Sequence, residues 1–272
     1  MHMSTVERLL DLLEGSSELR PLLRTLDQQQ VIGRFLNIDL TSKFQSIYEV
    51  SSNSQQPRYT TIGYEGWVRS FDAQNSEGLS PYNLFARAAR EHELIALDRL
   101  CRTLHAINFF SMSIPGFLFL NVHERLLKNI KYDHGRTFAA ILIAMGLNPG
   151  QIVIEIPEAA AGHRTFLEFI LENYHRNGFK VAINLPSAGL IHNLATLLEP
   201  DFYKIDARIA CSDGSISPLV DYTKHQSIPL IFKQIDSEER LETLLLAGAQ
   251  YVQGKLFLTQ TAQVDKETIA YT

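Results

Sequence analysis

The stretch that decides the fold is residues 180–206, which reads Lys-Val-Ala-Ile-Asn-Leu, then a loop and an amphipathic run, then Asp-Phe-Tyr-Lys-Ile-Asp. Each quoted segment is an apolar run that becomes polar only at its end. The run between them, residues 190–198, has helical spacing, so the stretch predicts a strand, a crossover helix and a second strand. In parallel α/β folds, sites lie at such strand ends, which here carry Asn184, Lys204 and Asp206.

The same alternation extends in both directions along the chain. Eight segments read as strands: residues 44–50, 59–69, 117–122, 151–156, 180–185, 202–206, 229–233 and 251–257. Segments with helical spacing lie between most of them, at residues 82–106, 124–145, 160–177, 190–198 and 237–247, and glycines stand at three expected C-terminal caps, Gly146, Gly178 and Gly248. Alternating strands and helices predict parallel pairing and a (β/α)8 TIM-type barrel. The first two strands have no helix between them, so we expect the barrel to begin with an irregular, antiparallel pair.

Before the barrel, residues 5–36 have apolar positions at helical spacing, interrupted at Gly15. We expect a helical pair there, and hence an N-terminal helical extension over residues 1–40 and a barrel domain over residues 41–272. Two interpretations stay open at this point: the pair packs on the barrel, or it offers a surface for a homodimer or another partner.

Composition excludes several classes of protein. A formal net charge of −5 over 272 residues, with pI near 6.0, argues against a nucleic-acid polymer as partner, although a single nucleotide remains open. Cys101 and Cys211 have no metal-ligand spacing, so neither a disulfide framework nor a structural zinc site is expected. No apolar run reaches the ~20 residues of a membrane span. We therefore expect a protein of the reducing cytoplasm.

Polar residues recur where the predicted strands end: Glu65, Asn121, Glu155, Asn184, Lys204, Asp206, Lys233 and Gln253. In a barrel these ends converge on one mouth, and their convergence predicts a site there. Carboxylates with an amide suit hard divalent cations, whereas Lys and Arg suit a phosphate ester.

At these residues the chain resembles the EAL family of cyclic-di-GMP phosphodiesterases, over about residues 42–257. The Glu-Ala-Leu signature with its following Arg corresponds to Glu65-Gly66-Trp67-Val68-Arg69, and the family's Gln-Pro-Ile to Gln45-Ser46-Ile47. The family's Leu-Glu-Ile-Thr-Glu resembles residues 154–158, its Leu-Lys-Ile-Asp residues 203–206, and its closing Gln-Gly residues 253–254. The resemblance implies a cyclic-di-GMP site at Glu65, Arg69, Asn121, Glu155, Lys204, Asp206 and Gln253.

The family's two-metal site is broken in this sequence. The resemblance implies that an Asp-Asp pair after the fifth strand and a later Glu are metal ligands, and these positions hold Asn184, Leu185 and Lys233. Lys233 brings an ammonium where a carboxylate faced the cations. Lys233 could alternatively pair with Glu65 or Glu155 and act as a structural counter-charge in place of the metal. Lys204 could likewise form an ion pair with Asp206 instead of contacting a phosphate. Trp67 replaces the signature's Leu and either stacks on a guanine or fills the mouth.

The sequence therefore predicts a degenerate EAL-like regulatory domain of bacterial signal transduction, with no catalytic residue, bound metal or cofactor. We expect it to act by binding an unidentified regulatory protein. Two alternatives stay open: the domain binds cyclic-di-GMP as well, or it acts without the nucleotide. The rival hypothesis is an active phosphodiesterase that uses a reduced metal set.

Overall fold

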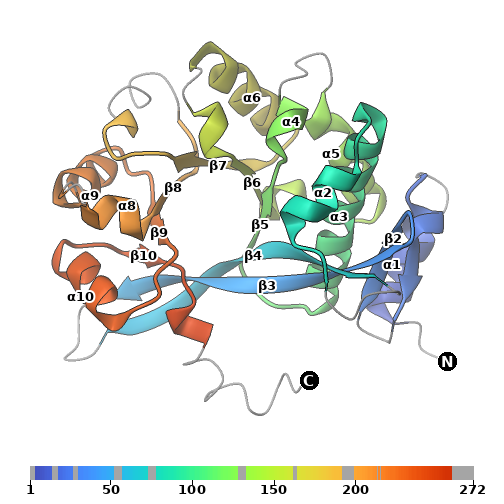
Figure 1. Cartoon of the computed structure of the whole chain (residues 1–272), viewed down its shortest axis with the longest axis horizontal. Coiled ribbons are helices and arrows are strands. Elements are labelled where there is room, and N and C mark those ends of the chain that lie inside the picture. Colours follow the sequence, from blue (N-terminus) through green and yellow to red (C-terminus); the bar gives the residue numbers. More distant parts are fainter. Residues whose placement is uncertain are drawn as a thin grey trace. The chain divides into compact units, whose positions relative to one another are not determined.

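The computed structural model describes residues 4–13, 18–26, 30–51, 57–72, 78–127, 133–161, 164–191, 199–212, 214 and 216–258 (Figure 1). Its strands are β1 (Leu23–Thr25), β2 (Val31–Phe35), β3 (Ile38–Ser51), β4 (Arg58–Asp72), β5 (Phe117–Asn121), β6 (Ile152–Ile156), β7 (Lys180–Leu185), β8 (Phe202–Asp206), β9 (Leu230–Lys233) and β10 (Tyr251–Val252). Its helices are α1 (Thr5–Leu13), α2 (Pro81–Arg87), α3 (Glu91–Ser111), α4 (Glu124–Leu127), α5 (His134–Ala144), α6 (Arg164–Arg176), α8 (Ala207–Ser212), α9 (Ile216–His225) and α10 (Glu238–Leu246), with 3-10 turns η1 (Arg20–Leu22), η2 (Pro149–Gln151) and η3 (Glu158–Ala160).

The strands form one sheet in the order β1-β2-β3-β10-β9-β8-β7-β6-β5-β4, and a further pairing of β3 with β4 closes it. Strands β7 to β10 pair in parallel, whereas β3 runs antiparallel to β10. All eight predicted strands are present as β3 to β10, and the reversed direction of β3 gives the expected antiparallel start. The predicted (β/α)8-type barrel is confirmed.

Contacts divide the chain into two compact units. Unit 1 comprises Met1–Phe44, Glu65–Ile154 and Glu172–Lys180, and unit 2 comprises Gln45–Tyr64, Glu155–Leu171 and Val181–Thr272. The predicted division into an extension and a barrel domain stays a prediction.

The expected helical pair at the N-terminus is wrong in its second half. Helix α1 is present, and it buries Val6, Leu9, Leu10 and Leu13. Residues 20–25 instead form η1 and β1, and residues 31–35 form β2, which pairs antiparallel with β1 and with β3. The helical spacing of the apolar residues did not decide the structure here. Pairing with the edge of β3 satisfies the backbone of residues 31–35 as a strand instead.

Three further boundaries differ from the sequence predictions. The helix expected at residues 82–106 is two helices, because Ala88 leaves the helical conformation with ψ of 77°. The strand expected at residues 251–257 ends at Val252, because Gly254 lies against the backbone of Ile235, where a Cβ would clash. Helices α8 and α9 follow β8 in a region for which the sequence predicted none. The crossover helix expected at residues 190–198 lies largely outside the described residues.

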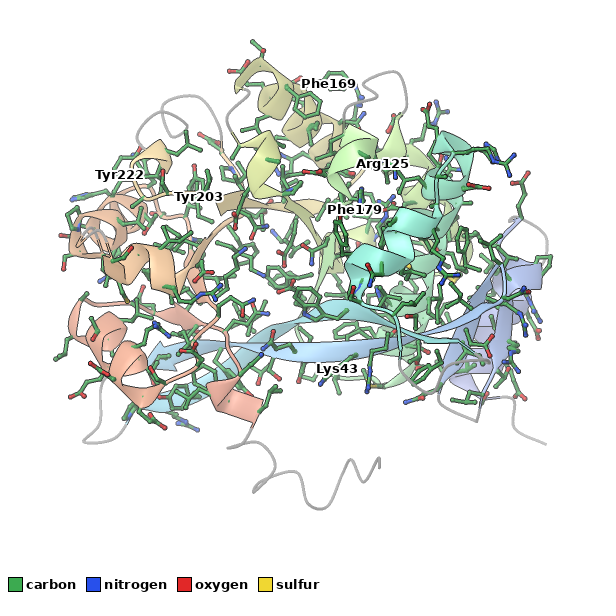
Figure 2. The ribbon with its side chains drawn as sticks, viewed as in Figure 1. Lys43, Arg125, Phe169, Phe179, Tyr203 and Tyr222 are labelled. Carbon is green, nitrogen blue, oxygen red and sulfur yellow. The ribbon has the colours of Figure 1, made fainter. Side chains whose placement is uncertain are left out.

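Two core arrangements fix the elements around the site. In unit 2, Tyr203 of β8 is fully buried beside Tyr222 of α9, and burial raises the pKa of its phenol (Figure 2). In unit 1, α3 contains a buried ion pair between Asp98 and Arg102, and the guanidinium lies 4.9 Å from the ring centre of Phe138. The predicted C-terminal caps are confirmed: Gly146, Gly178 and Gly248 all have positive φ, which glycine adopts without strain.

Candidate functional site

The buried centre of the unit 2 site is the ion pair of Glu155 and Lys204. Lys204 Nζ lies 2.5 Å from Glu155 Oε1, with both side chains almost completely buried. Asn184 Nδ2 donates to the other oxygen of the same carboxylate, Oε2, at 3.2 Å, and to the carbonyl of Ile156 at 3.1 Å. Strand register explains the cluster, since Asn184 and Lys204 are paired across β7 and β8. Three of the predicted site positions therefore form one hydrogen-bonded group.

Lys233 extends this group toward the surface. Its ammonium donates to Asn184 Oδ1 at 2.8 Å and to Glu158 Oε1 at 3.0 Å. The predicted counter-charge role of Lys233 is thus realised with different partners, because neither Glu65 nor Glu155 pairs with it. The predicted pairing of Lys204 with Asp206 is wrong as well: Lys204 lies on Glu155.

Asp206 is held instead by Arg208, two residues along the chain. The guanidinium binds both carboxylate oxygens, with Nη2 to Oδ2 at 2.5 Å and Nε to Oδ1 at 3.0 Å, and the backbone N–H of Arg208 also donates to Oδ1 at 2.8 Å. Burial favours the neutral acid, but these hydrogen bonds and the nearby charge of Lys233 outweigh it and hold the pKa of Asp206 below its ordinary value. The carboxylate is therefore charged and fully engaged.

The last predicted residue of unit 2, Gln253, lies beside another residue of the family resemblance. Gln253 Nε2 donates to Gln45 Oε1 at 3.2 Å, which joins the closing Gln-Gly to the segment before the signature. The backbone just after β9 is also constrained. Gln234 has φ of 63°, a left-handed conformation that glycine adopts without strain but that glutamine rarely adopts.

Unit 1 brings two further predicted residues together. Asn121 Nδ2 donates to Glu65 Oε1 at 2.7 Å, from the end of β5 to a buried position on β4. Gly66, where the signature has Ala, is explained by its neighbours: a Cβ there would lie 3.2 Å from Leu120 Cδ2 and 3.3 Å from His105 Cγ. A methyl group there would require Leu120 and His105 to shift by a few tenths of an ångström. That both groups of residues open onto one mouth stays a prediction.

The residues of unit 2 do not fit a divalent metal ion. Both oxygens of Glu155 accept from cationic or amide donors, and the amide oxygen of Asn184 accepts from the ammonium of Lys233. Leu185 is a fully buried apolar residue rather than a ligand. Within the described ranges, no group of three or more His, Cys, Asp or Glu side chains is arranged to hold a metal. The oxygen atoms of Glu155 and Asn184 that could bind a cation accept hydrogen bonds from Lys204 and Lys233 instead.

Sequence reasoning missed two functional partners in this arrangement, Glu158 and Arg208. A signal for each was present: Glu158 ends the segment that resembles Leu-Glu-Ile-Thr-Glu, and Arg208 follows Asp206 by two residues. Neither signal specifies a partner, because only the fold decides which of several nearby charges pair.

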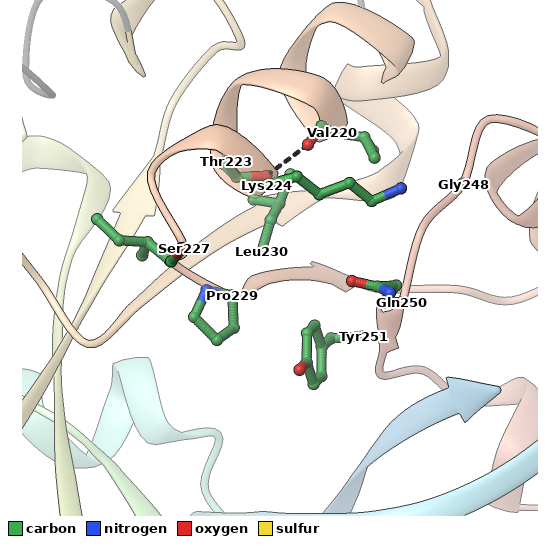
Figure 3. Close-up of a pocket in the computed structure, with 10 residues that line it drawn as sticks. Val220, Thr223, Lys224, Ser227, Pro229, Leu230, Gly248, Gln250 and Tyr251 are labelled. Atoms are coloured by element: carbon green, nitrogen blue, oxygen red, sulfur yellow. Dashed lines mark hydrogen bonds between the residues drawn. The ribbon is translucent and has the colours of Figure 1, made fainter.

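A hollow of about 210 Å³ lies at the amino ends of β9 and β10, away from the polar residues at the carboxyl ends of the strands (Figure 3). It is smaller than most ligand pockets, and its polar groups are partly engaged. The hydroxyl of Thr223 donates to the carbonyls of Leu219 and Val220, and that of Tyr251 donates to Glu49 at 3.2 Å. The ammonium of Lys224 extends toward Gly248.

Comparison with known proteins agrees with the fold. Residues 29–260 match the family described as the EAL domain. Among solved structures, the FimX EAL domain of Pseudomonas aeruginosa bound to c-di-GMP has 21% sequence identity and a TM-score of 0.62, covering 92% of this chain and 93% of that chain. The FimX EAL domain of Xanthomonas citri in complex with c-di-GMP has 18% identity and a TM-score of 0.63, covering 93% and 91%. No curated protein matches the sequence.

A third structure is longer than this chain. The Bacillus subtilis YkuI protein, with an EAL domain, in complex with c-di-GMP and calcium, has 23% identity and a TM-score of 0.65, covering 80% of this chain but 55% of its own length. An EAL enzyme bound to cAMP and cyclic-di-GMP is likewise covered over only 65% of its length.

The order and pairing of the strands define a (β/α)8-type barrel protein, which carries polar residues at the carboxyl ends of several strands. The chain belongs to the EAL-domain family, as the match over most of its length shows. Across the described part of the chain, no helix combines the length and apolar character needed to cross a bilayer.

Proposed function

We propose that the chain is a regulatory EAL domain of cyclic-di-GMP signalling, which binds the dinucleotide without hydrolysing it and acts through a protein partner. The observation that carries this proposal is the neutralisation of the unit 2 site by lysine: Lys204 lies on Glu155, and Lys233 lies on Asn184 and Glu158. The family resemblance implies metal ions at this position, where they would activate water and neutralise the phosphodiester. In this chain the ammonium groups of Lys204 and Lys233 supply positive charge at this position instead.

The electrostatics oppose hydrolysis by the family's reaction. At a separation of ~4 Å and an effective dielectric near 20, two unit charges interact with about 4 kcal/mol, and a divalent cation doubles the repulsion from each ammonium. A metal at Glu155 would also have to displace Lys204 from a pair that is buried on both sides. The cost falls on metal binding itself, before any chemical step.

Binding of the dinucleotide is supported by the residues that remain. Arg69 is retained, and no ion pair with a carboxylate of the described residues occupies it, so its guanidinium is available for a phosphate. Three similar structures were determined with c-di-GMP bound. A site neutralised by lysine should bind the dinucleotide equally well without divalent metal.

The alternative is an active cyclic-di-GMP phosphodiesterase with a reduced metal set. The observation that favours it is the retention of Glu65, Asn121 and Glu155, with Glu65 and Asn121 held together in unit 1. Both functions involve cyclic-di-GMP, but they differ in whether a metal is needed and whether a product is formed. A homodimer and a cytoplasmic location stay predictions.

Calorimetric titration with cyclic-di-GMP, in EDTA and in magnesium or manganese, tests the proposal when it is combined with a hydrolysis assay. We expect the same dissociation constant in both buffers and no linear dinucleotide above the buffer control. Metal-dependent binding with product formation would establish the alternative, and no binding in either buffer would remove the nucleotide from the proposal.

A matched variant sharpens the test. Asn184→Asp with Lys233→Glu converts an amide and an ammonium to carboxylates and leaves the buried Leu185 untouched. We expect the folded double variant to bind manganese more tightly than the parent. Equal manganese affinity in the two proteins would show that charge is not the main defect of the site.

A further inference from the structure

Strands β2 and β3 separate at a fork that a buried asparagine fills. Strand β2 pairs with β3 from Phe35 to Gly33, in a register that would set Val31 opposite Ser42. The side chain of Asn108, buried on α3, lies between these two residues instead. Its Oδ1 accepts from the backbone N–H of Val31 at 2.7 Å, and its Nδ2 donates to the carbonyl of Val31 at 2.9 Å and to Ser42 Oγ at 3.1 Å. Asn108 therefore fixes the separation of the two strands at the fork.

The hydrogen bonds continue from the fork toward the signature strand β4. Ser42 Oγ lies 2.7 Å from Nδ1 of His105, which is three residues before Asn108 on α3. A hydroxyl group can accept and donate at once, so Ser42 joins the amide of Asn108 to the imidazole. The imidazole in turn lies against Gly66, where a Cβ would be 3.3 Å from His105 Cγ. Because Gly66 has no side chain, a displacement of the imidazole acts directly on the backbone of β4.

Helix α3 lies close to both strands, in each case at a glycine. On β2, a Cβ at Gly33 would lie 3.3 Å from Leu100 Cδ1, and Leu100 is five residues before His105 on the same helix. Closely packed interiors have few voids and transmit small displacements. Helix α3 is therefore a rigid spacer between β2 and β4.

The last residue on this path belongs to the predicted site. Glu65 immediately precedes Gly66, and its carboxylate accepts from Asn121 at 2.7 Å. Leu120, which precedes Asn121, is the other close neighbour of Gly66. The position of the backbone at Gly66 thus affects both Glu65 and its amide partner. All of these residues belong to unit 1.

We propose that Asn108, Ser42 and His105 are positioning residues for Glu65, and that they couple the docking of β2 to nucleotide binding. This inference rests on the proposed function, since it takes cyclic-di-GMP as the ligand at Glu65. The three residues act through Gly66 and not by touching the nucleotide. Coupling between two sites is reciprocal, so a change that loosens β2 weakens nucleotide binding, and the bound nucleotide stabilises the docked β2.

Two substitutions of Ser42 test the path, because alanine removes the hydroxyl group and threonine keeps it. In calorimetry, Ser42→Ala should bind cyclic-di-GMP about 5-fold more weakly than the parent, the equivalent of one net hydrogen bond of about 1 kcal/mol. Ser42→Thr should bind within about 2-fold of the parent, since it restores the hydrogen bond. Thr223→Val, which removes a buried hydroxyl group from α9 in unit 2, is the control and should leave the affinity unchanged.

Trp67 gives a second readout that needs no nucleotide. It is the only tryptophan in the chain, and it follows Gly66 on β4. Without nucleotide, its emission maximum and its quenching by acrylamide should change in Ser42→Ala but not in Ser42→Thr or Thr223→Val. A merely structural role of the hydroxyl group would lower stability without altering the surroundings of Trp67 in the folded protein.

Hydrogen exchange tests the reverse direction of the coupling. Saturating cyclic-di-GMP should slow the exchange of the Val31 backbone N–H, which Asn108 holds, by a similar factor of about 5. The N–H of Ile228, which donates to the carbonyl of Thr223 at the end of α9, is the control and should keep its rate.

The outcomes separate this inference from the proposed function. If the nucleotide binds, but Ser42→Ala matches the parent in affinity and emission, the positioning role is wrong and the proposed function stands. Equal losses in Ser42→Ala and Ser42→Thr would also overturn the role, because the hydroxyl group would not be the link. If the parent binds no nucleotide, the proposed function loses its ligand, and the emission of Ser42→Ala decides whether the fork positions β4: a shift supports the path, and no shift overturns it.

Discussion

Replacing Lys204 with Met should destabilise the protein strongly, and in a way that depends on pH. Methionine approximates the length of the lysine but removes its charge, and the side chain of Lys204 is completely buried. Glu155, also buried, then loses its ion pair with Lys204, for which the hydrogen bond from Asn184 is a weaker substitute. Removing one partner of a buried ion pair typically costs 3–5 kcal/mol, because the other charge is left uncompensated.

An independent estimate gives the same magnitude. In the variant, the least costly response is for the carboxylate of Glu155 to bind a proton. A carboxyl group with an ordinary pKa of about 4.3, held neutral at pH 7.5, costs about 1.4 kcal/mol for each of roughly three pH units, or about 4 kcal/mol. The folded variant then binds one more proton than its unfolded chain. Its deficit relative to the parent should therefore shrink as the pH falls, to about 2 kcal/mol at pH 5.5.

Urea denaturation of parent and variant at pH 7.5 and 5.5 measures this deficit directly. Lys204→Met combined with Glu155→Gln should recover most of the loss at pH 7.5, since the buried charge is gone. Lys224→Met, at an exposed lysine, is the control and should change stability by no more than about 0.5 kcal/mol. A deficit below about 1 kcal/mol at pH 7.5, or one that is the same at both pH values, would refute the reasoning.

Three further predictions concern the local structure. Gln234→Gly should stabilise the protein by up to about 1 kcal/mol in urea denaturation, because φ of 63° strains most side chains but not glycine. Gln234→Val should destabilise the protein, because a β-branched residue fits this conformation poorly, and stabilisation by valine would contradict the prediction. Gly66→Ala, which restores the signature's Ala, should cost roughly 1–3 kcal/mol through crowding of Leu120 and His105, and an unchanged melting temperature would show that the neighbours adjust freely. Burial lowers the pKa of His105 to about 4. The unfolded chain therefore takes up the proton first as the pH falls below about 6.5, so up to about 3 kcal/mol of stability should be lost between pH 6.5 and 4, and His105→Leu should flatten this part of the pH profile.

The sequence by itself determined the barrel fold, and it predicted a site at the polar strand ends. Apolar runs that end in polar residues located β3 to β10, because a buried strand must hide its whole length and can tolerate polarity only where it emerges. Glycines marked helix ends for a similarly local reason. The order of the motifs at Glu65, Glu155 and Lys204 indicated the EAL family.

Only the tertiary structure decided which charges pair. Lys204 has Asp206 two residues away in sequence, yet β7 and β8 place it against Asn184 and Glu155, and Asp206 turns to Arg208. Residues 31–35 likewise form a strand despite their helical spacing, because β2 pairs with the backbone of β3, which local propensity does not predict. Local patterns fix where a strand or helix forms, but the partner of a buried charge depends on neighbours brought together from distant parts of the chain.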